Sequence, residues 1–170
     1  LLMSNLMYEF SVPMFINNLN ILSVILLKAE KHAEKKKIDK SIFVNARLYP
    51  DMLPLSKQIQ IGTDMVRLGL GRLINVKAPS FEDNELTFSD LQKRIKKTIS
   101  FLKKIKVKQM EGVESKKIEF KIRKNNFKFK DGRIYLRDWI IPHFFFHMTT
   151  TYDILRANGV NLGKRDFIKM

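Results

Sequence analysis

The sequence predicts an all-α bundle of four helices with a small β-hairpin between the third and fourth helices. Three observations support this prediction. Apolar residues recur at helical spacing in four stretches of the 170-residue chain. The spacing changes to strict alternation at about 117–130, as in a strand pair. The segment 138–158 is apolar on nearly every side, which is typical of a helix in the middle of a fold. We therefore expect one domain over 1–170.

Composition narrows the class of protein. The chain has no cysteine, which removes disulfides, thiolate metal sites and cysteine nucleophiles and favours a reducing compartment. No apolar run approaches the roughly 20 residues that span a bilayer, and the start lacks the basic region and cleavage site of a signal peptide. We expect a cytoplasmic protein without a membrane partner. The net charge of +15 reflects 32 basic against 17 acidic residues, and lysine predominates.

Two apolar stripes define the first two helices, at about 11–36 and about 52–75. Ser11 and Pro13 suit the first turn, because serine can accept an unpaired amide and proline lacks the amide that would be orphaned there. The stripe residues are Val12, Phe15, Leu19, Leu22, Leu26, Ala29 and Ala33 in the first helix, and Leu55, Ile59, Gly62, Val66, Gly69 and Leu73 in the second.

The third helix is expected at about 87–106 and carries the most basic part of the chain. From Lys93 to Lys108 there are eight basic residues and no acidic one. We interpret this run as a solvated helix face, which is also the best candidate for an anion-binding or nucleic-acid patch. Nucleic acid is not expected as a partner, because no aromatic residues interleave on the exposed side as base stacking would require. Phe88, Leu91, Ile95, Leu102 and Ile105 form the apolar face.

The hairpin is expected at about 117–130, with a turn at Asn125-Asn126. A two-stranded hairpin is marginal alone, so its apolar face should lie against the bundle. The fourth helix follows at about 133–158. The tail after Gly159 is expected to fold back through Val160, Leu162 and Phe167.

His143 and His147 are the candidate metal ligands. They stand four residues apart on the fourth helix, so both imidazoles can reach one ion. Zinc or nickel would need a third ligand, which Asp51, Gln58 or Asp64 could supply from the second helix. The alternative is that both histidines are buried in an aromatic core and bond to Asp64, Gln58 or Thr150. His32 is interpreted as a surface residue.

Five motifs in order resemble the domain-of-unknown-function 1993 family of bacterial proteins, which is grouped with the DinB/YfiT-like four-helix proteins. The resemblance covers almost the whole chain. The motifs are Tyr8 to Phe15 (YEFSVPMF), Arg47 to Ile61 (RLYPDMLPLSKQIQI), Pro79 to Glu85 (PSFEDNE), Phe144 to Arg156 (FFFHMTTTYDILR) and Asn158 to Phe167 (NGVNLGKRDF).

This resemblance implies a four-helix bundle with a strand pair between its last two helices. Better-studied DinB-like proteins include thiol-dependent transferases and maleylpyruvate isomerase-like enzymes, and their metal site uses three histidines. An H-x-x-x-H pair from the fourth helix supplies two of them, and His143 and His147 match that pair. The third comes from the second helix, which contains no histidine here.

Two functions are therefore considered, and the sequence does not decide whether the protein is an enzyme. The first is a metal-dependent or small-molecule-binding enzyme with a pocket between helices two and four. Asp51, Gln58, Asp64 and Thr150 would line that pocket, and a divalent zinc or nickel would be the cofactor. The second is a non-catalytic, dimeric binding or stress-related protein with structural histidines and a basic partner-binding face. A homodimer is expected, as is common for soluble oligomers.

Overall fold

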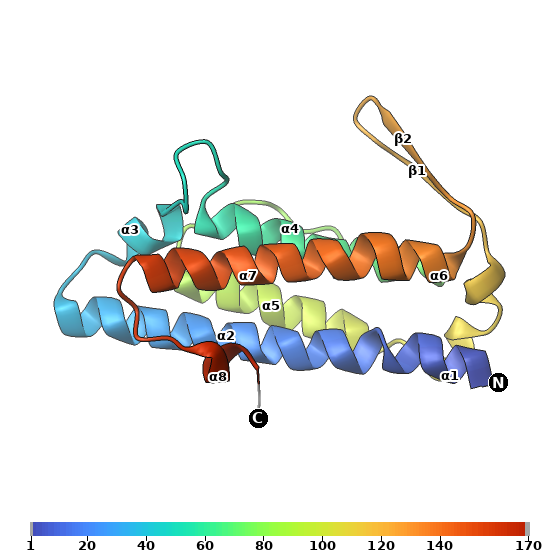
Figure 1. Ribbon diagram of the computed structural model, residues 1–170, viewed down its shortest axis with the longest axis horizontal. Helices are drawn as coiled ribbons and strands as arrows, with labels where there is room; N and C mark the ends of the chain where they lie inside the picture. The colour runs from blue at the N-terminus through green and yellow to red at the C-terminus, as the bar shows by residue number, and fades with distance from the viewer. Residues whose placement is uncertain (1, 169–170) are drawn as a thin grey trace.

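The computed structural model describes residues 2–168, and helices dominate this part of the chain (Figure 1). The longest helices lie side by side: α2 (Val12–Lys36), α4 (Leu55–Leu73), α5 (Phe88–Leu102) and α7 (Ile141–Ala157). The shorter segments are α1 (Leu2–Glu9), α3 (Lys40–Asn45), η1 (Val107–Met110), η2 (Val113–Ser115), α6 (Gly132–Tyr135), the π-helical turn η3 (Leu136–Ile140) and α8 (Lys164–Phe167). The prediction of a predominantly helical fold with a small antiparallel hairpin is confirmed.

The core is built from the stripes that the sequence predicts. Every stripe residue named above for the first three helices is buried. Glycines on α4 let α7 come close: a Cβ at Gly62 would lie 3.3 Å from His147 Cβ, and one at Gly69 would lie 2.9 Å from the Ile140 side chain. The helix that carries the histidines is therefore held directly against α4.

The loop between α4 and α5 is fastened to α4. Asn75 adopts a positive φ of 57°, and the amide of Val76 donates to the carbonyl of Gly71 at 2.8 Å. The Arg67 guanidinium donates to the carbonyl of Pro79. Thr87 and Asp90 then form a capping box that starts α5. The helix ends at Leu102, before the expected 106, and the chain continues through a turn into η1.

The hairpin pairs β1 (Ile118–Ile122) with β2 (Asn125–Phe129), and its predicted turn is wrong. The turn is at Arg123-Lys124, because the register places Phe120 opposite Phe127 and leaves Asp131 free to cap α6. The hairpin tip projects from the bundle (Figure 1), while Phe120 and Phe129 on its apolar face pack against the core. Its phenylalanine rings contact Tyr135 and Trp139 at its base, which supplies the packing that a free hairpin lacks.

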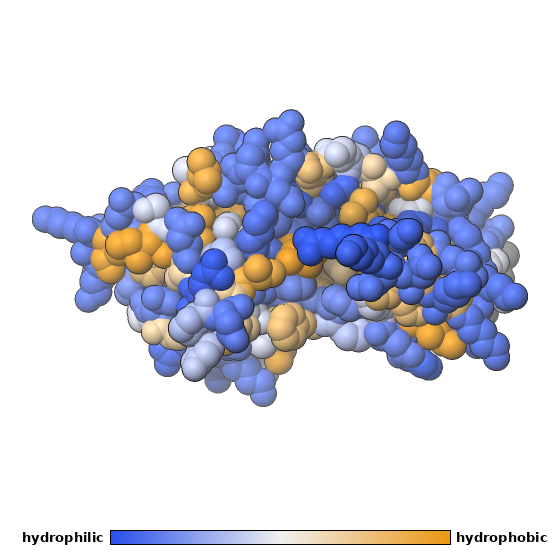
Figure 2. All heavy atoms as spheres, turned by 90° about the horizontal axis from the view of Figure 1, so that it is seen from above, coloured by the Kyte–Doolittle hydropathy of each residue, from blue (hydrophilic) through white to orange (hydrophobic). Residues whose placement is uncertain are grey.

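The N-terminal helical segment and the tail complete the fold. The segment Asn5–Lys36 is long and apolar enough, by length and composition, to cross a membrane. A core helix passes the same test, and the stripe of α2 is buried here, so this is weak evidence for a membrane span. Val160 and Leu162 in the tail are buried, and Phe167 packs on Tyr152, as expected. Figure 2 shows the hairpin side of the molecule, where hydrophilic residues predominate.

Candidate functional site

His147 on α7 and Gln58 on α4 are joined by a hydrogen bond. Their Nδ1 and Oε1 atoms lie 2.7 Å apart. The amide nitrogen of Gln58 donates to the carbonyl of Leu53 at 3.0 Å, so Oε1 is the acceptor. Nδ1 of His147 therefore carries the proton, and Nε2 keeps a free lone pair.

Burial keeps this histidine neutral. His147 is 8% exposed. Its pKa is lowered to about 4, chiefly because burial penalises the charged ring and secondly because a charge on His143 would repel it. At neutral pH the ring therefore donates through Nδ1 and carries no charge.

His143 lies one turn earlier on α7 and is half-buried. Its Nδ1 lies 2.8 Å from the carbonyl oxygen of Trp139, and the two rings are 4.2 Å apart between centroids. A carbonyl accepts, so Nδ1 is the donor here too. In metal sites the second ring nitrogen of a histidine ligand is often held in this way.

A third metal ligand is not in place. Asp51 lies exposed in the turn before α4. Oδ1 of Asp64 accepts from Arg67 at 2.5 Å and from Arg94 at 2.6 Å. Within residues 2–168, no three histidine, cysteine, aspartate or glutamate side chains form a group that could hold a metal ion.

The surroundings of His147 are also closed. The space beside it leaves no room for a water molecule. Thr150 is turned away into its own helix, where its hydroxyl donates to the carbonyl of Phe146 at 2.8 Å. The structure thus brings Gln58 to His147 but places Asp51, Asp64 and Thr150 elsewhere. These side chains do not fit a catalytic metal centre with three protein ligands and an open position. The closed space is lined by Leu22, Gln58, Ile59, Gly62, Thr63, Phe144, His147, Met148 and Thr151.

Asp64 instead belongs to a buried ionic network around Arg94. Arg94 is 2% exposed, and its guanidinium contacts Asp64 at 2.6 Å, Glu85 at 2.9 Å and Asp83 at 3.0 Å. Burial alone would lower the pKa of Arg94, but the hydrogen bond to Glu85 and the three carboxylate charges raise it above its ordinary value. The network ties the loop to α4 and α5. The network is not evident from the sequence, because the basic run groups Arg94 with the solvated lysines although it neighbours the core residue Ile95.

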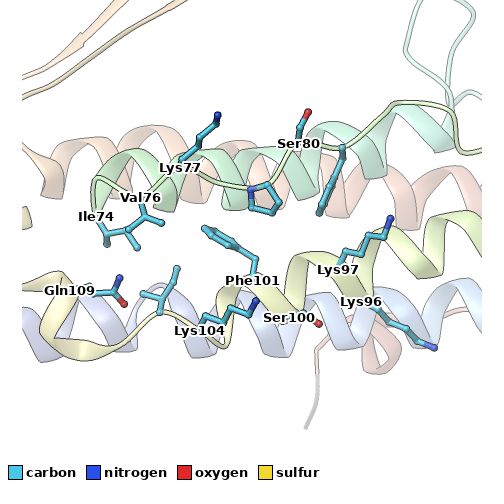
Figure 3. Close-up of a pocket in the computed structure, with 13 residues that line it drawn as sticks. Ile74, Val76, Lys77, Ser80, Lys96, Lys97, Ser100, Phe101, Lys104 and Gln109 are labelled. Atoms are coloured by element: carbon cyan, nitrogen blue, oxygen red, sulfur yellow. The ribbon is translucent and has the colours of Figure 1, made fainter.

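The largest described hollow lies on another side of the molecule, between the α4–α5 loop and α5 (Figure 3). We call it the lysine cleft, and its volume is about 770 Å³. The basic run of α5 supplies part of its wall, and Phe81 and Phe101 add aromatic surface that the sequence did not place beside the lysines. The cleft is lined by Ile74, Val76, Lys77, Pro79, Ser80, Phe81, Lys96, Lys97, Ser100, Phe101, Lys104, Ile105 and Gln109.

Comparison with known proteins places this geometry in context. The family model described as "Domain of unknown function (DUF1993)" matches residues 7–168. The crystal structure of a DinB family member protein from Shewanella denitrificans is 31% identical, with a TM-score of 0.90, over 99% of this chain and 94% of that chain. No curated protein matches. The similarity thus extends over the bundle, the hairpin and the tail.

Proposed function

The chain belongs to the DUF1993 family of DinB-like proteins, and from that premise we propose that it is a binding protein for small anionic molecules. In this proposal the histidine pair is structural, and the ligand binds on the basic face of α5. This proposal corresponds to the second of the two functions considered from the sequence, the non-catalytic binding protein.

One observation carries the structural role of the histidines. His147 is neutral, buried and bonded to Gln58 in a space without room for water. A buried polar ring needs a partner, and Gln58 provides it. A catalytic zinc site would need three protein ligands and an open position, and neither condition fits this donor set.

The basic face supplies the binding half of the proposal. Among the described residues, Lys96, Lys97 and Lys104 take part in no ion pair, whereas Arg94 is fully engaged. With a chain charge of +15, these exposed lysines attract anions. A small molecule is a better match than nucleic acid, because the lysines border a hollow and not an extended aromatic surface.

Elemental analysis by mass spectrometry tests the structural role of the histidines. Untagged protein purified without chelator should carry well under one equivalent of zinc or nickel, alone and after titration with either metal. About one equivalent that disappears in both His143→Ala and His147→Ala would overturn this part of the proposal. Circular dichroism of the two variants shows whether they have folded.

The second candidate is a metal-dependent enzyme with its pocket between α4 and α7. One observation favours it: both Nδ1 atoms are bonded to oxygen, at 2.7 and 2.8 Å, which leaves both Nε2 atoms free. A zinc or nickel ion held there would need further ligands from outside the protein. The same elemental analysis decides between the two candidates.

The homodimer stays a prediction. Val24 and Leu27 on α2 are 51% and 45% exposed, so apolar surface is available on this helix. Size-exclusion chromatography with light scattering would measure the mass against the 20.0 kDa of one chain.

A further inference from the structure

We infer that the lysine cleft is the binding site for a small amphipathic carboxylate, whose apolar body lies under the α4–α5 loop and whose head group meets Lys97 and Lys104. This inference rests on the proposed function and names the location and class of its ligand. The cleft is separate from the histidine pair, which lies between α4 and α7.

The α4–α5 loop forms the roof of the cleft, and it is held in place before any ligand binds. Val76 and Pro79 are fixed by the hydrogen bonds to Gly71 and Arg67 described above. The Phe81 ring lies beneath the Arg67 guanidinium, 4.2 Å from its carbon to the ring centroid. Cation–π contacts of this kind hold an aromatic ring in place. A preformed roof lowers the ordering cost of binding.

The walls are largely apolar. Phe101 rises from α5 into the gap below the loop (Figure 3) and is half-buried, and the buried Ile105 also lines the cleft. Flat aromatic walls suit a flat apolar body. The volume of about 770 Å³ lies within the roughly 300–1,000 Å³ of small-molecule sites. A bare inorganic ion would leave most of this apolar surface uncovered.

The charged side chains that line the cleft have one sign, whereas Glu82, Glu85 and Asp90 line the adjoining hollow that shares Lys97. Lys77, Lys96, Lys97 and Lys104 line the cleft, and no carboxylate does. Figure 3 shows Lys97 rising toward the loop and Lys104 running along the helix with its nitrogen below Phe101, whereas Lys77 and Lys96 point away. Among the described residues, the side-chain ammonium groups of Lys97 and Lys104 have no hydrogen-bond or ion-pair partner. An anionic head group would therefore find two free ammonium groups beside the apolar walls.

Isothermal titration calorimetry with three matched probes tests the inference. 2-Naphthoate has both the body and the head group, 2-naphthol has the body without the charge at pH 7, and acetate has the charge without the body. The wild-type chain should bind 2-naphthoate at least about tenfold more tightly than either of the others. 2-Naphthol lacks the hydrogen bond to a charged group, which contributes about that factor, and acetate lacks the apolar surface whose burial stabilises the complex.

Two double variants locate the site. Lys97→Ala/Lys104→Ala should weaken 2-naphthoate binding about tenfold. Lys103→Ala/Lys106→Ala is the matched control, because it removes the same charge from exposed positions of the same segment that do not line the cleft. It should change the affinity less than about twofold. All four positions are exposed, so both variants should fold.

The outcomes separate the inference from the proposed function. Equal losses of 2-naphthoate affinity in the two double variants would overturn the assignment of the cleft as the binding site and leave a diffuse anion-binding face. Equal affinity for 2-naphthol and 2-naphthoate would remove the role of the lysines. If the wild-type chain binds neither 2-naphthoate nor acetate, the cleft and the anion-binding function both fail.

Discussion

The Nδ1 atom of His147 lies 2.7 Å from Oε1 of Gln58, and this hydrogen bond connects α7 to α4 across the middle of the fold. Both residues are buried, at 8% and 2% exposure. Gln58 is itself held by the carbonyl of Leu53, so its amide is oriented before it meets the ring. The contact therefore stabilises one tautomer of His147.

Replacing Gln58 with leucine should destabilise the fold. The change leaves the Nδ1 proton of His147 buried without an acceptor, which costs about 1–3 kcal/mol in the free energy of unfolding. In the double variant with His147→Phe, both polar partners are gone and much of this loss should be recovered. Urea unfolding of the two single variants and the double variant measures the coupling. Additive losses would show that the bond contributes nothing specific.

Acidification should weaken the fold through His147. Its folded pKa is lowered to about 4, whereas an unfolded histidine titrates near 6.5. This stabilising contribution is complete above pH 6.5 and is lost as the pH falls toward 4, because the unfolded chain then binds a proton that the folded chain does not. The slope is about 1.4 kcal/mol per pH unit in that window.

The variant His147→Gln isolates this effect, because it cannot titrate while the carboxylates still do. Urea unfolding at pH 7 and pH 5 should show a smaller loss of stability in the variant than in the wild type. Identical losses would contradict the assignment of the buried neutral ring.

Arg94→Met should be strongly destabilising. The substitution removes the cation that contacts Glu85 and one of the two that contact Asp64, which keeps Arg67, and removing one member of a buried ionic group costs about 3–5 kcal/mol. Lys93→Met is the matched control on the same helix, since the Lys93 side chain is 68% exposed and should change stability by less than about 0.5 kcal/mol. Thermal unfolding of both variants makes the comparison, and similar melting temperatures would speak against the network.

Gly132→Ala should disturb the junction before α6. A Cβ at this position would lie 2.0 Å from the carbonyl oxygen of Val113, so the backbone must shift, at a cost of about 1–3 kcal/mol. Gly163→Ala is the control, because nothing lies within 4 Å of its Cβ position. Chemical unfolding of the two variants should show a clearly lower stability for Gly132→Ala. Equal stability of the two variants would contradict the close contact at Gly132.

The helical part of the fold was predictable because its signal is local. A helix brings residues three and four apart onto one face, so the buried stripes from Val12 and Leu55 can be read directly from spacing. Alternation likewise marked the hairpin strands. The hairpin turn was misplaced by two residues, because its position depends on which phenylalanines pair across the strands.

The sequence could name candidate residues for the site, but it could not predict which of them are in contact. Helical spacing puts His143 and His147 on one face, and of the three polar residues proposed as their neighbours, Gln58 meets His147 whereas Asp51 and Asp64 do not. Which of them meets His147 depends on how α4 and α7 are rotated against each other, and Gln58 is 89 positions away in the chain. The same rotation turns Asp64 toward Arg94.

Periodicity, composition and motif order thus indicate from the sequence a predominantly helical DinB-like chain with a small hairpin and a basic third long helix. The choice between a metal ligand set and a closed histidine–glutamine contact arises only when the helices pack, because coordination and burial are properties of side chains from distant segments. The lysine cleft has the same origin: Lys96 and Lys97 come from α5, Lys104 from the turn after it, and the roof from a loop that Arg67 fastens to α4.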